Sequence, residues 1–359
     1  MGHEIALVGA GRMGSLHARN AAANPRFRLK AVADHDEQLA GRLASELESS
    51  VASYANILAD PAIRAVIVAS STSSHLENVL AAVNAGKAVF CEKPLSLDAD
   101  TLASALPEIE RSGMPVFVAF NRPFGPHLRE LKRQSDSGAV GALETLHIVN
   151  HDPAPPRLDF VPRSGGLFKD FTIHDFDTAR WITGDAVIEV FAIGSCLVDP
   201  EIGRLGDIDT AKLVLRNRNG ALCMISNSRR TGYGYDQRVE LSGSKGALRV
   251  DNVHSQQVSR LDEAGEASAP FPYSFAERYA DAYKAELDHF ADVLDGGAAP
   301  STGPNDSLAA LRLADAAELS FRTGAPVELC GEDRVHGIAV IGAGRIGRIH
   351  AGNARVHPG

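Results

Sequence analysis

The chain has 359 residues, of which 44% are hydrophobic and 23% are charged, and its net charge is −9. These proportions are typical of a globular protein, and the length suits two domains. The charges form no block of one sign, which argues against a nucleic-acid partner or an anionic membrane surface, and no apolar run reaches the ~18–20 residues of a membrane span.

The first part of the chain alternates short apolar runs with amphipathic segments, which predicts a parallel sheet with helices on both faces. The predicted strands are Ile5–Val8, Leu29–Ala33, Ala65–Ala69, Ala88–Cys91 and Val116–Phe120. The predicted helices are Ser15–Ala23, Asp36–Glu48, Leu76–Ala85 and Asp100–Ser112. We therefore expect an α/β chain whose residues 1–122 form a Rossmann domain, a doubly wound parallel sheet.

A glycine-rich segment, Gly-Ala-Gly-Arg-Met-Gly, occupies positions 9–14 directly after the first predicted strand. In such a fingerprint Gly9 permits a tight turn, Gly11 lets the backbone approach a pyrophosphate, and Gly14 lets the next helix pack closely. The start of that helix favours phosphate groups. Asp34 ends the second predicted strand, where a carboxylate binds the adenosine ribose and repels a 2′-phosphate. The segment predicts NAD in preference to NADP, and a glycine-rich turn with a surface Asp34 is the alternative.

From about residue 125 the pattern changes to longer alternating runs, which predict a large, open, mainly antiparallel sheet. These runs are Leu143–Val149, Val187–Val198, Ala211–Arg216, Ala221–Ser228, Arg238–Leu241 and Ala247–Val250. The sequence Asn-Arg-Asn-Gly at 217–220 predicts a hairpin turn. Two helices, Ser274–Leu294 and Asn305–Thr323, would close this α+β domain over residues 123–332, with a loop insertion at His254–Pro272.

Lys93 lies in the sequence Cys-Glu-Lys-Pro at 91–94, directly after the fourth predicted strand. Ligands of α/β sheets bind at the carboxyl ends of the strands. A lysine there places a cation beside a nicotinamide, where it would favour an alkoxide-like transition state. A surface lysine before a proline turn is the alternative.

Asp170 and His174 are four residues apart in a segment predicted to be helical as far as Gly184. That spacing puts them on one face of a helix. A carboxylate beside an imidazole orients the ring and stabilises the imidazolium that forms when the ring takes a proton. The alternative is structural, because Asp177 lies one turn further on and could pair with His174 instead.

A third segment, Tyr-Gly-Tyr-Asp at 233–236, could supply a tyrosine that hydrogen-bonds a hydroxylated substrate. Strand tyrosines are more often core or edge residues, so both interpretations stay open.

Over residues 3–330 these segments resemble the glucose–fructose oxidoreductase/inositol dehydrogenase (Gfo/Idh/MocA) family, in order as well as in motif. The motifs in question are the glycine fingerprint, Ser-Thr-Ser-Ser-His at 71–75, Gly-Lys at 86–87, Glu-Lys-Pro at 92–94 and Asp-x-x-x-His at 170–174. Within the family the chain looks most like the inositol 2-dehydrogenases. The segments that carry this resemblance are Ser-Gly-Gly at 164–166, Ile-His-Asp-Phe-Asp at 173–177, Arg-Trp at 180–181, the Asp-Pro turn at 152–153 and Tyr-Gly-Tyr-Asp at 233–236.

The resemblance implies an NAD-dependent oxidation of a ring hydroxyl, from myo-inositol to 2-keto-myo-inositol. His174 would act as the base, Asp170 would orient it, and Lys93 would stabilise the oxyanion. An NAD(P)-dependent dehydrogenase of another cyclic polyol or an aldose, and a non-catalytic NAD-binding regulator, are the alternatives. A regulator would be expected to lack one of these three residues, and all are present.

The resemblance also implies the binding residues. Those for the cofactor are Gly9, Gly11, Arg12, Met13, Gly14, Asp34, Ser71, Thr72, His75, Glu92, Lys93 and Asn121. Those for the substrate are Lys93, Arg122, Asp152, Asp170, His174 and Tyr235. Asp152 stands where inositol dehydrogenases place a polar substrate contact, often an Asn. A homotetramer built by pairing the open sheet faces is implied as well.

The fingerprint is repeated near the end of the chain. His3–Arg26 laid over His336–Gly359 gives 13 identities in 24 positions. The second copy has no second or third strand behind it, so we expect residues 333–359 to form no second NAD site. This tail is expected to be a poorly ordered appendage, or one that pairs with a sheet edge of its own chain or of a neighbour.

The four cysteines, Cys91, Cys196, Cys223 and Cys330, are scattered along the chain. This pattern fits reduced thiols of a cytoplasmic protein better than a disulfide framework. No closely spaced ligand cluster suggests a metal. The first apolar run enters the glycine loop instead of a cleavage site, which argues against a signal peptide.

Overall fold

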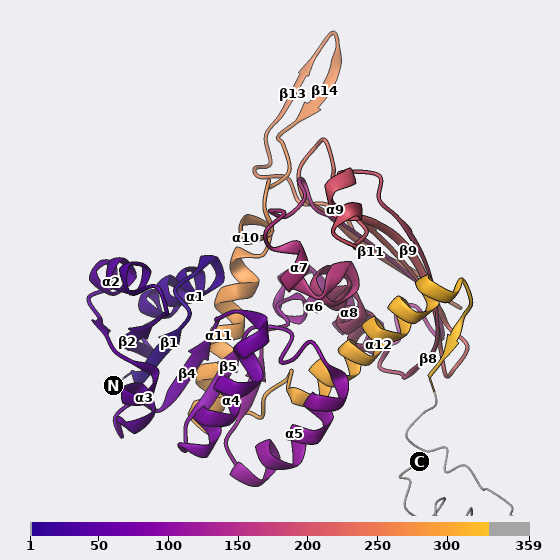
Figure 1. Ribbon diagram of the computed structural model, residues 1–359. Coiled ribbons are helices and arrows are strands. Elements are labelled where there is room, and N and C mark those ends of the chain that lie inside the picture. Colours follow the sequence, from indigo (N-terminus) through magenta and orange to yellow (C-terminus); the bar gives the residue numbers. More distant parts are fainter. Residues whose placement is uncertain (1, 330–359) are drawn as a thin grey trace, which may run out of the picture.

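Figure 1 shows the computed structural model of the chain, which describes residues 2–329. Two β-sheets organise these residues: a parallel sheet built from the N-terminal part and a larger mixed sheet built from the rest. The predicted α/β fold, a Rossmann sheet followed by an α+β unit, is confirmed. The repeated fingerprint near the C-terminus lies outside the described residues.

The first sheet has six parallel strands in the order β3-β2-β1-β4-β5-β6. They are β1 (His3–Val8), β2 (Phe27–Ala33), β3 (Ser50–Val51), β4 (Ala65–Val68), β5 (Ala88–Cys91) and β6 (Val116–Val118). Alternate residues of the central strands enter two different cores. Val66 and Val68 of β4 join one core, and Ile67 joins the other. Because a parallel sheet is covered on both faces, its strands are continuously apolar.

Helices cover both faces of this sheet. They are α1 (Arg12–Ala23), α2 (Glu37–Glu46), α3 (Tyr54–Ala59), α4 (His75–Asn84) and α5 (Ala99–Ser112), with a short 3₁₀ turn η1 (Thr72–Ser74) before α4. Side-chain caps fix several starts: Asp36 accepts from the N–H groups of Gln38 and Leu39, and Asp98 accepts from that of Thr101. Such caps satisfy donors that the first turn of a helix leaves free. The short elements β3 and α3 were not predicted.

The second sheet has seven strands in the order β12-β11-β7-β10-β9-β8-β15. They are β7 (Leu143–His151), β8 (Val187–Ser195), β9 (Thr210–Asn217), β10 (Leu222–Ser228), β11 (Asp236–Gly243), β12 (Gly246–Val250) and β15 (Val327–Glu328). Neighbours run antiparallel except β7 and β10, which are parallel. The predicted turn between β9 and β10 is present, with Gly220 at φ +92°.

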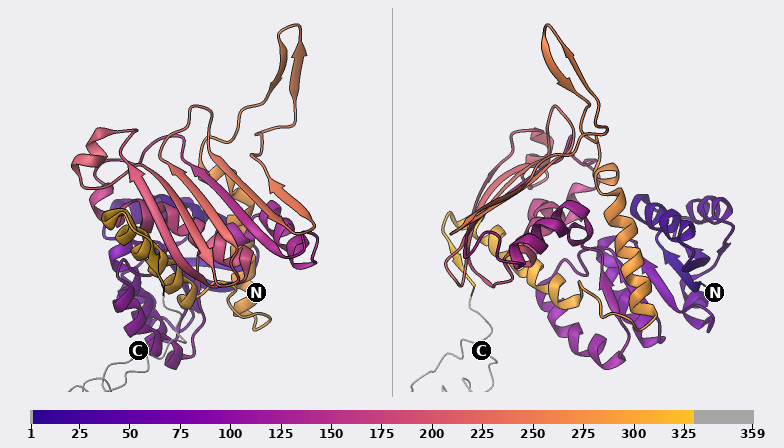
Figure 2. Two further views of the ribbon diagram at one scale, coloured as in Figure 1. Left: turned by 90° about the vertical axis from the view of Figure 1, so that its right-hand side faces the viewer. Right: turned by 180° about the vertical axis from the view of Figure 1, so that it is seen from behind.

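Helices cover one face of this sheet, as Figure 2 shows. They are α6 (Pro126–Asp136), α7 (Val161–Ser164), α8 (Ile173–Thr183) and α12 (Pro304–Thr323), with a π-helical turn η3 (Phe168–Thr172) before α8 and a 3₁₀ turn η2 (Arg122–Phe124) before α6. A short helix, α9 (Pro200–Arg204), follows β8. On the other face Ile193, Val214 and Met224 are exposed.

Helix α11 (Ala280–Leu294) packs against the first sheet, although it comes from the C-terminal part of the chain. Its Phe290 contacts Phe27, Phe90 and Phe117, with ring centroids 5.6–6.4 Å apart. The single helix predicted for 274–294 is broken at Tyr279, and the short piece before the break is α10 (Phe275–Arg278). The expectation that this helix closes the second unit is therefore wrong, because it covers the first sheet.

The predicted loop insertion at 254–272 contains a hairpin, β13 (Ser259–Asp262) and β14 (Gly265–Ser268). The hairpin stands away from the rest of the molecule in Figures 1 and 2. Among residues 2–329, no helix combines the length and the apolar character that a membrane span requires.

Candidate active site

The three fingerprint glycines lie in the loop after β1 and meet different steric conditions. A Cβ at Gly9, whose φ is +97°, would lie 2.5 Å from the backbone of Ala69, and one at Gly14 would lie 1.7 Å from the carbonyl oxygen of Gly9. A Cβ at Gly11 would meet no protein atom within 4 Å. The protein's own packing therefore requires the first and third glycines, whereas Gly11 borders open space at the start of α1. This cradle fits a pyrophosphate.

Asp34 joins this loop to the end of β2. Its Oδ2 accepts a hydrogen bond from the backbone N–H of Ala10 at 2.6 Å, and its Oδ1 accepts one from the N–H of Asp36 at 2.8 Å. The Asp34 side chain is nearly buried, while the neighbouring His35 is almost fully exposed. A carboxylate is thus held at the position where a ribose reader is expected.

Ser71, Thr72 and His75 follow β4, which is the neighbour of β1 in the sheet. The strand order reverses between β1 and β4, because the chain continues from β1 to β2 on one side and from β4 to β5 on the other. Open α/β sheets bind their ligands at such a switch point. Ser71 is exposed and Thr72 is partly exposed. His75 is buried, with Nδ1 2.8 Å from the Pro94 carbonyl and Nε2 3.0 Å from that of Ser70. Both ring nitrogens of His75 therefore have partners within the protein, and the side chain connects the loops that follow β4 and β5.

Arg12 and Met13 occupy the first turn of α1. Arg12 is exposed, and its guanidinium lies 4.3 Å from the ring centroid of Phe275 in α10. Met13 is partly buried against the core that α11 shares with the sheet.

Lys93 follows β5 at the carboxyl edge of the sheet. Its Nζ donates to the backbone oxygen of Asp170 at 2.8 Å and lies 3.7 Å from the Oδ1 of the same residue. The peptide bond between Lys93 and Pro94 is cis. The structure therefore brings Lys93 into contact with the Asp170 segment. Glu92, by contrast, points away from this contact and into a buried pair with His17.

His174, in the first turn of α8, is partly buried. Its Nδ1 is buried without a hydrogen-bond partner among the described residues. Burial lowers the pKa of His174 well below its usual value, and the positive charges of Lys93 and Arg122 lower it further. The imidazole is therefore neutral at neutral pH and able to accept a proton.

The expected hydrogen bond between Asp170 and His174 is not formed, so that sequence expectation is corrected. Asp170 instead accepts from Arg229, with Nη2 2.7 Å from Oδ2, and lies beside Lys93. Burial tends to raise the pKa of Asp170, but the charges of Arg229 and Lys93 outweigh it and the pKa is lowered. A buried carboxylate between two cations pairs with them in preference to a neutral imidazole.

Arg229 is the residue that sequence reasoning missed. It directly follows β10, is buried, and bridges two carboxylates: Nη1 lies 3.2 Å from Asp152 and Nη2 2.7 Å from Asp170. Its guanidinium also lies 4.6 Å from the Phe171 ring centroid. Burial raises the pKa of Asp152 although Arg229 opposes this. Its position depends on the parallel pairing of β7 with β10, which the sequence pattern does not reveal and which places Asp152 and Arg229 next to each other, directly after the paired residues His151 and Ser228.

Asn121 and Arg122 follow β6 and are buried, so neither has the open position expected of it. Arg122 donates to Asn121 at 2.9 Å and to the Tyr235 hydroxyl at 2.8 Å, and stacks 4.0 Å from the Tyr279 ring centroid. Tyr235, which is 1% exposed, donates to Asn150 at 2.9 Å. The expected substrate contact of Tyr235 is therefore not supported: its hydroxyl already has two partners. The amide Nδ2 of Asn121, however, is buried without a partner among the described residues.

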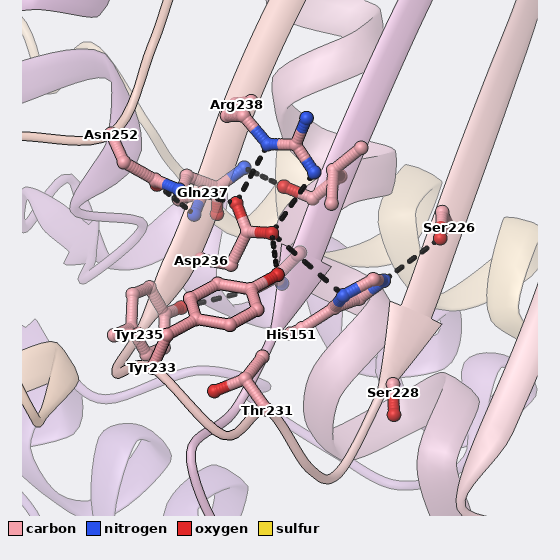
Figure 3. Close-up of polar contacts among 12 residues, drawn as sticks. His151, Ser226, Ser228, Thr231, Tyr233, Tyr235, Asp236, Gln237, Arg238 and Asn252 are labelled. Atoms are coloured by element: carbon pink, nitrogen blue, oxygen red, sulfur yellow. Dashed lines mark hydrogen bonds and ion pairs between the residues drawn. The ribbon is translucent and has the colours of Figure 1, made fainter. Parts of the chain in front are cut away.

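The other polar residues of segment 233–236 face the open side of the sheet. Asp236 accepts from the Tyr233 hydroxyl at 2.6 Å, from Nε and Nη2 of Arg238, and from the Asn252 side chain. These contacts are drawn in Figure 3. His151 lies 3.9 Å from the same carboxylate and hydrogen-bonds Ser226. These contacts tie strands together, so Tyr233 and Asp236 are structural.

A second buried network lies beneath the site and was not predicted. Asp175 accepts from the side-chain amides of Asn150 at 3.1 Å and Asn227 at 2.7 Å. Burial raises the pKa of Asp175 to about 6, against the effect of these hydrogen bonds. The network fixes the start of α8 on β7 and β10, and so fixes the position of the neighbouring His174. Among residues 2–329, no group of three or more His, Cys, Asp or Glu side chains could hold a metal ion.

The strand order, the glycine cradle and the carboxylate after β2 define a Rossmann-type dinucleotide-binding protein. Residues 3–120 match the model of an oxidoreductase family with an NAD-binding Rossmann fold, and residues 128–249 match the GFO/IDH/MocA C-terminal domain. The chain is 42% identical over 327 residues to the myo-inositol 2-dehydrogenase of Thermotoga maritima, covering 90% of this chain and 98% of that relative. The chain therefore belongs to the GFO/IDH/MocA family and is an NAD-binding oxidoreductase.

Solved structures agree with this assignment. A myo-inositol dehydrogenase from Corynebacterium glutamicum superposes with a TM-score of 0.88 at 37% identity, over 92% of this chain and all of that one. A scyllo-inositol dehydrogenase from Lactobacillus casei, solved with bound NAD(H) and scyllo-inositol, superposes with a TM-score of 0.86 at 28% identity, over 91% of this chain and 99% of that one.

Proposed function

We propose that this chain is a cytoplasmic enzyme that oxidises a ring hydroxyl of an inositol, converting myo-inositol to 2-keto-myo-inositol with NAD. The observation that carries the proposal is the contact between Lys93 and Asp170 at the carboxyl edge of the NAD-binding sheet. The unprotonated His174 lies four residues after Asp170 in the sequence. Relatives named inositol dehydrogenases support the choice of substrate.

His174 acts as the base. It takes the proton of the reacting hydroxyl as the carbon loses its hydrogen with the bonding pair, which leaves a ketone. The lowered pKa of His174 suits this task, because the ring is unprotonated before the alcohol binds. General-base catalysis of this kind is typically worth ~10²–10⁴ in rate.

Lys93 stabilises the developing oxyanion, and Asp170 holds Lys93 in place. The backbone oxygen of Asp170 accepts from the Lys93 ammonium, and its carboxylate lies 3.7 Å away. Arg229 keeps this carboxylate ionised from the other side. Asp170 therefore acts on the ammonium, in place of the role on His174 that its spacing suggested.

NAD, when bound, accepts the hydride from the carbinol carbon. Its phosphates would be held at Gly11 and the start of α1, and its ribose by Asp34. The buried, unpartnered amide of Asn121 fits a donor to the cofactor from the β6 side.

Asp152, held by Arg229, is proposed as an acceptor for substrate hydroxyl groups. A carboxylate at this position could also suit another cyclic polyol or an aldose, which is the second candidate. We also propose that the chain forms a homotetramer through the exposed face of the second sheet.

A screen of NADH formation tests the function. The purified chain is incubated with NAD and, in turn, myo-inositol, scyllo-inositol, other cyclic polyols and aldoses. The highest kcat/KM is expected with myo-inositol. A kcat/KM at least tenfold higher with an aldose than with myo-inositol would favour the second candidate. Binding of NAD without turnover of any compound in the screen would favour a non-catalytic regulator.

A further inference from the structure

A buried cluster of three titratable side chains lies behind Lys93, on the side away from Asp170. His17 of α1 is 0% exposed, and its Nε2 lies 2.6 Å from Oε1 of Glu92. Glu286 of α11 is also 0% exposed, and its Oε1 lies 3.8 Å from Nδ1 of His17. The other carboxylate oxygen of Glu92 accepts from the backbone N–H of Lys93 at 3.3 Å.

Hydrogen bonding in this cluster is incomplete at one end. Nδ1 of His17 and both carboxyl oxygens of Glu286 are buried without a partner among the described residues. An unpaired buried polar group destabilises the folded chain. An ionised Glu286 would add an unpaired buried charge close to the carboxylate of Glu92, whereas a protonated Glu286 adds no charge.

The charges around the cluster support this allocation of protons. Burial tends to raise the pKa of Glu92, but the hydrogen bond from His17 and the positive charges of His17 and Lys93 outweigh it, and the pKa is lowered. Burial and the negative charge of Glu92 raise the pKa of Glu286 well above its usual value. Other titratable groups near the cluster are Tyr283 of α11, His75 of α4 and Cys91 of β5. One carboxylate and one neutral acid therefore flank the imidazole.

We propose that Glu286, His17 and Glu92 form a chain of positioning residues that fixes Lys93. The neutral Glu286 faces Nδ1 of His17 at 3.8 Å, Nε2–H of His17 donates to Glu92, and the ionised Glu92 accepts from the backbone N–H of Lys93. The chain of contacts starts on α11, crosses α1, whose first turn follows the glycine loop, and ends at the ammonium-bearing residue. It links the cofactor loop to Lys93, and it rests on the function proposed for Lys93.

Kinetics of paired variants test the positioning role. Glu92→Gln and His17→Gln are expected to lower kcat by about tenfold or more with KM changed less than threefold, because a small displacement of a reacting group is costly. In Glu92→Gln the pH profile of kcat is expected to change, because a negative charge next to Lys93 is removed. Asp177→Asn, a buried carboxylate on α8 outside the cluster, serves as the matched control, with an unchanged profile.

Glu286 is tested by a pair of substitutions. Glu286→Leu is expected to lower kcat as Glu92→Gln does, and Glu286→Gln to restore at least a third of the parent turnover, because the amide keeps the shape, polarity and neutrality of the protonated acid. Equal losses in both variants would mean that Glu286 acts as an anion. Loss of thermal stability in all variants with kcat and pH profiles unchanged would reduce the cluster to a structural role. Either result overturns the proposal.

Infrared difference spectroscopy gives a readout that does not depend on activity. The parent spectrum minus that of Glu286→Gln at neutral pH should contain the C=O stretching band of a protonated carboxylic acid. A carboxylate band in its place would overturn the proposal even if Lys93→Met confirmed the catalytic role of Lys93. Conversely, if Lys93→Met had the kcat of the parent, the function proposed for Lys93 would be overturned. The acid band of Glu286 would persist in that case, so the two failures can be told apart.

Discussion

The cations around Asp170 determine what this carboxylate can do. Sequence spacing alone placed it beside His174, but Arg229 and Lys93 draw it to the opposite side. The imidazole is then left without a charged partner, and the same cation, Lys93, helps to keep it unprotonated. At this scale the contacts of one buried charge set the protonation state of its neighbour.

His174→Ala is expected to reduce turnover by ~10²–10⁴ while leaving NAD binding unchanged. Because the pKa of His174 lies below its usual value, the acid limb of the parent kcat/KM profile should fall below the ordinary histidine range. Steady-state rates and NAD titration measure both effects. His151→Asn, another partly buried histidine but on the open sheet face, is the control. Turnover within threefold of the parent would remove His174 from the mechanism.

Asp34 predicts a preference for NAD over NADP of at least about tenfold in kcat/KM, because a carboxylate facing a 2′-phosphate is repelled. The combined change Asp34→Ala with His35→Arg should admit NADP, since position 35 is exposed beside the carboxylate. The ratio of kcat/KM for the two cofactors measures the effect. Equal use of both cofactors by the parent would contradict the assigned role.

At the scale of elements, the periodicity of apolar residues predicted those helices and strands whose position depends on the local sequence. The β1-loop-α1 unit, β4, β5 and α4 lie close to their expected ranges, because continuous apolar runs between glycine and capping residues admit few alternatives. Contacts between distant segments could not be derived in the same way. The parallel pairing of β7 with β10, which brings Arg229 to Asp152, and the attachment of α11 to the first sheet both depend on tertiary packing.

Helix α8 carries a buried carboxyl that makes stability depend on pH. Burial raises the pKa of Asp177 from 3.8 to about 7. The folded chain keeps this proton up to about pH 7 and the unfolded chain loses it near pH 4, so the free energy of unfolding falls as pH rises through this range. Asp177→Asn should therefore raise Tm relative to the parent at pH 8 and not at pH 4, as calorimetry can determine. A gain of equal size at both values would contradict this assignment.

At the scale of the whole molecule, the second sheet has one covered face and one face with exposed apolar side chains. Val214, Met224 and Ile193 are 39%, 50% and 53% exposed on the latter. An exposed apolar surface of this kind marks an interface more often than a solvated face. The proposed tetramer would bury it.

Met224→Glu is expected to shift the chain to smaller species, because a charge would be desolvated at the centre of that face. Size-exclusion chromatography with light scattering gives the mass of the parent and the variant. Leu319→Glu, equally exposed at 50% but on α12, is the matched control and should keep the parent mass. A parent that is already monomeric, or two variants with the same mass, would exclude this face as the interface.

The position of α11 also has a consequence for biosynthesis. The aromatic residues Phe27, Phe90 and Phe117 leave the ribosome well before Phe290, which covers them in the finished protein. Translation proceeds at roughly 5–20 residues per second, so the nascent N-terminal part carries an uncovered apolar face for many seconds. The nucleotide-binding half therefore reaches its final state only after most of the substrate half has been synthesised, and during that interval it is a natural client for chaperones that bind exposed aromatic surface.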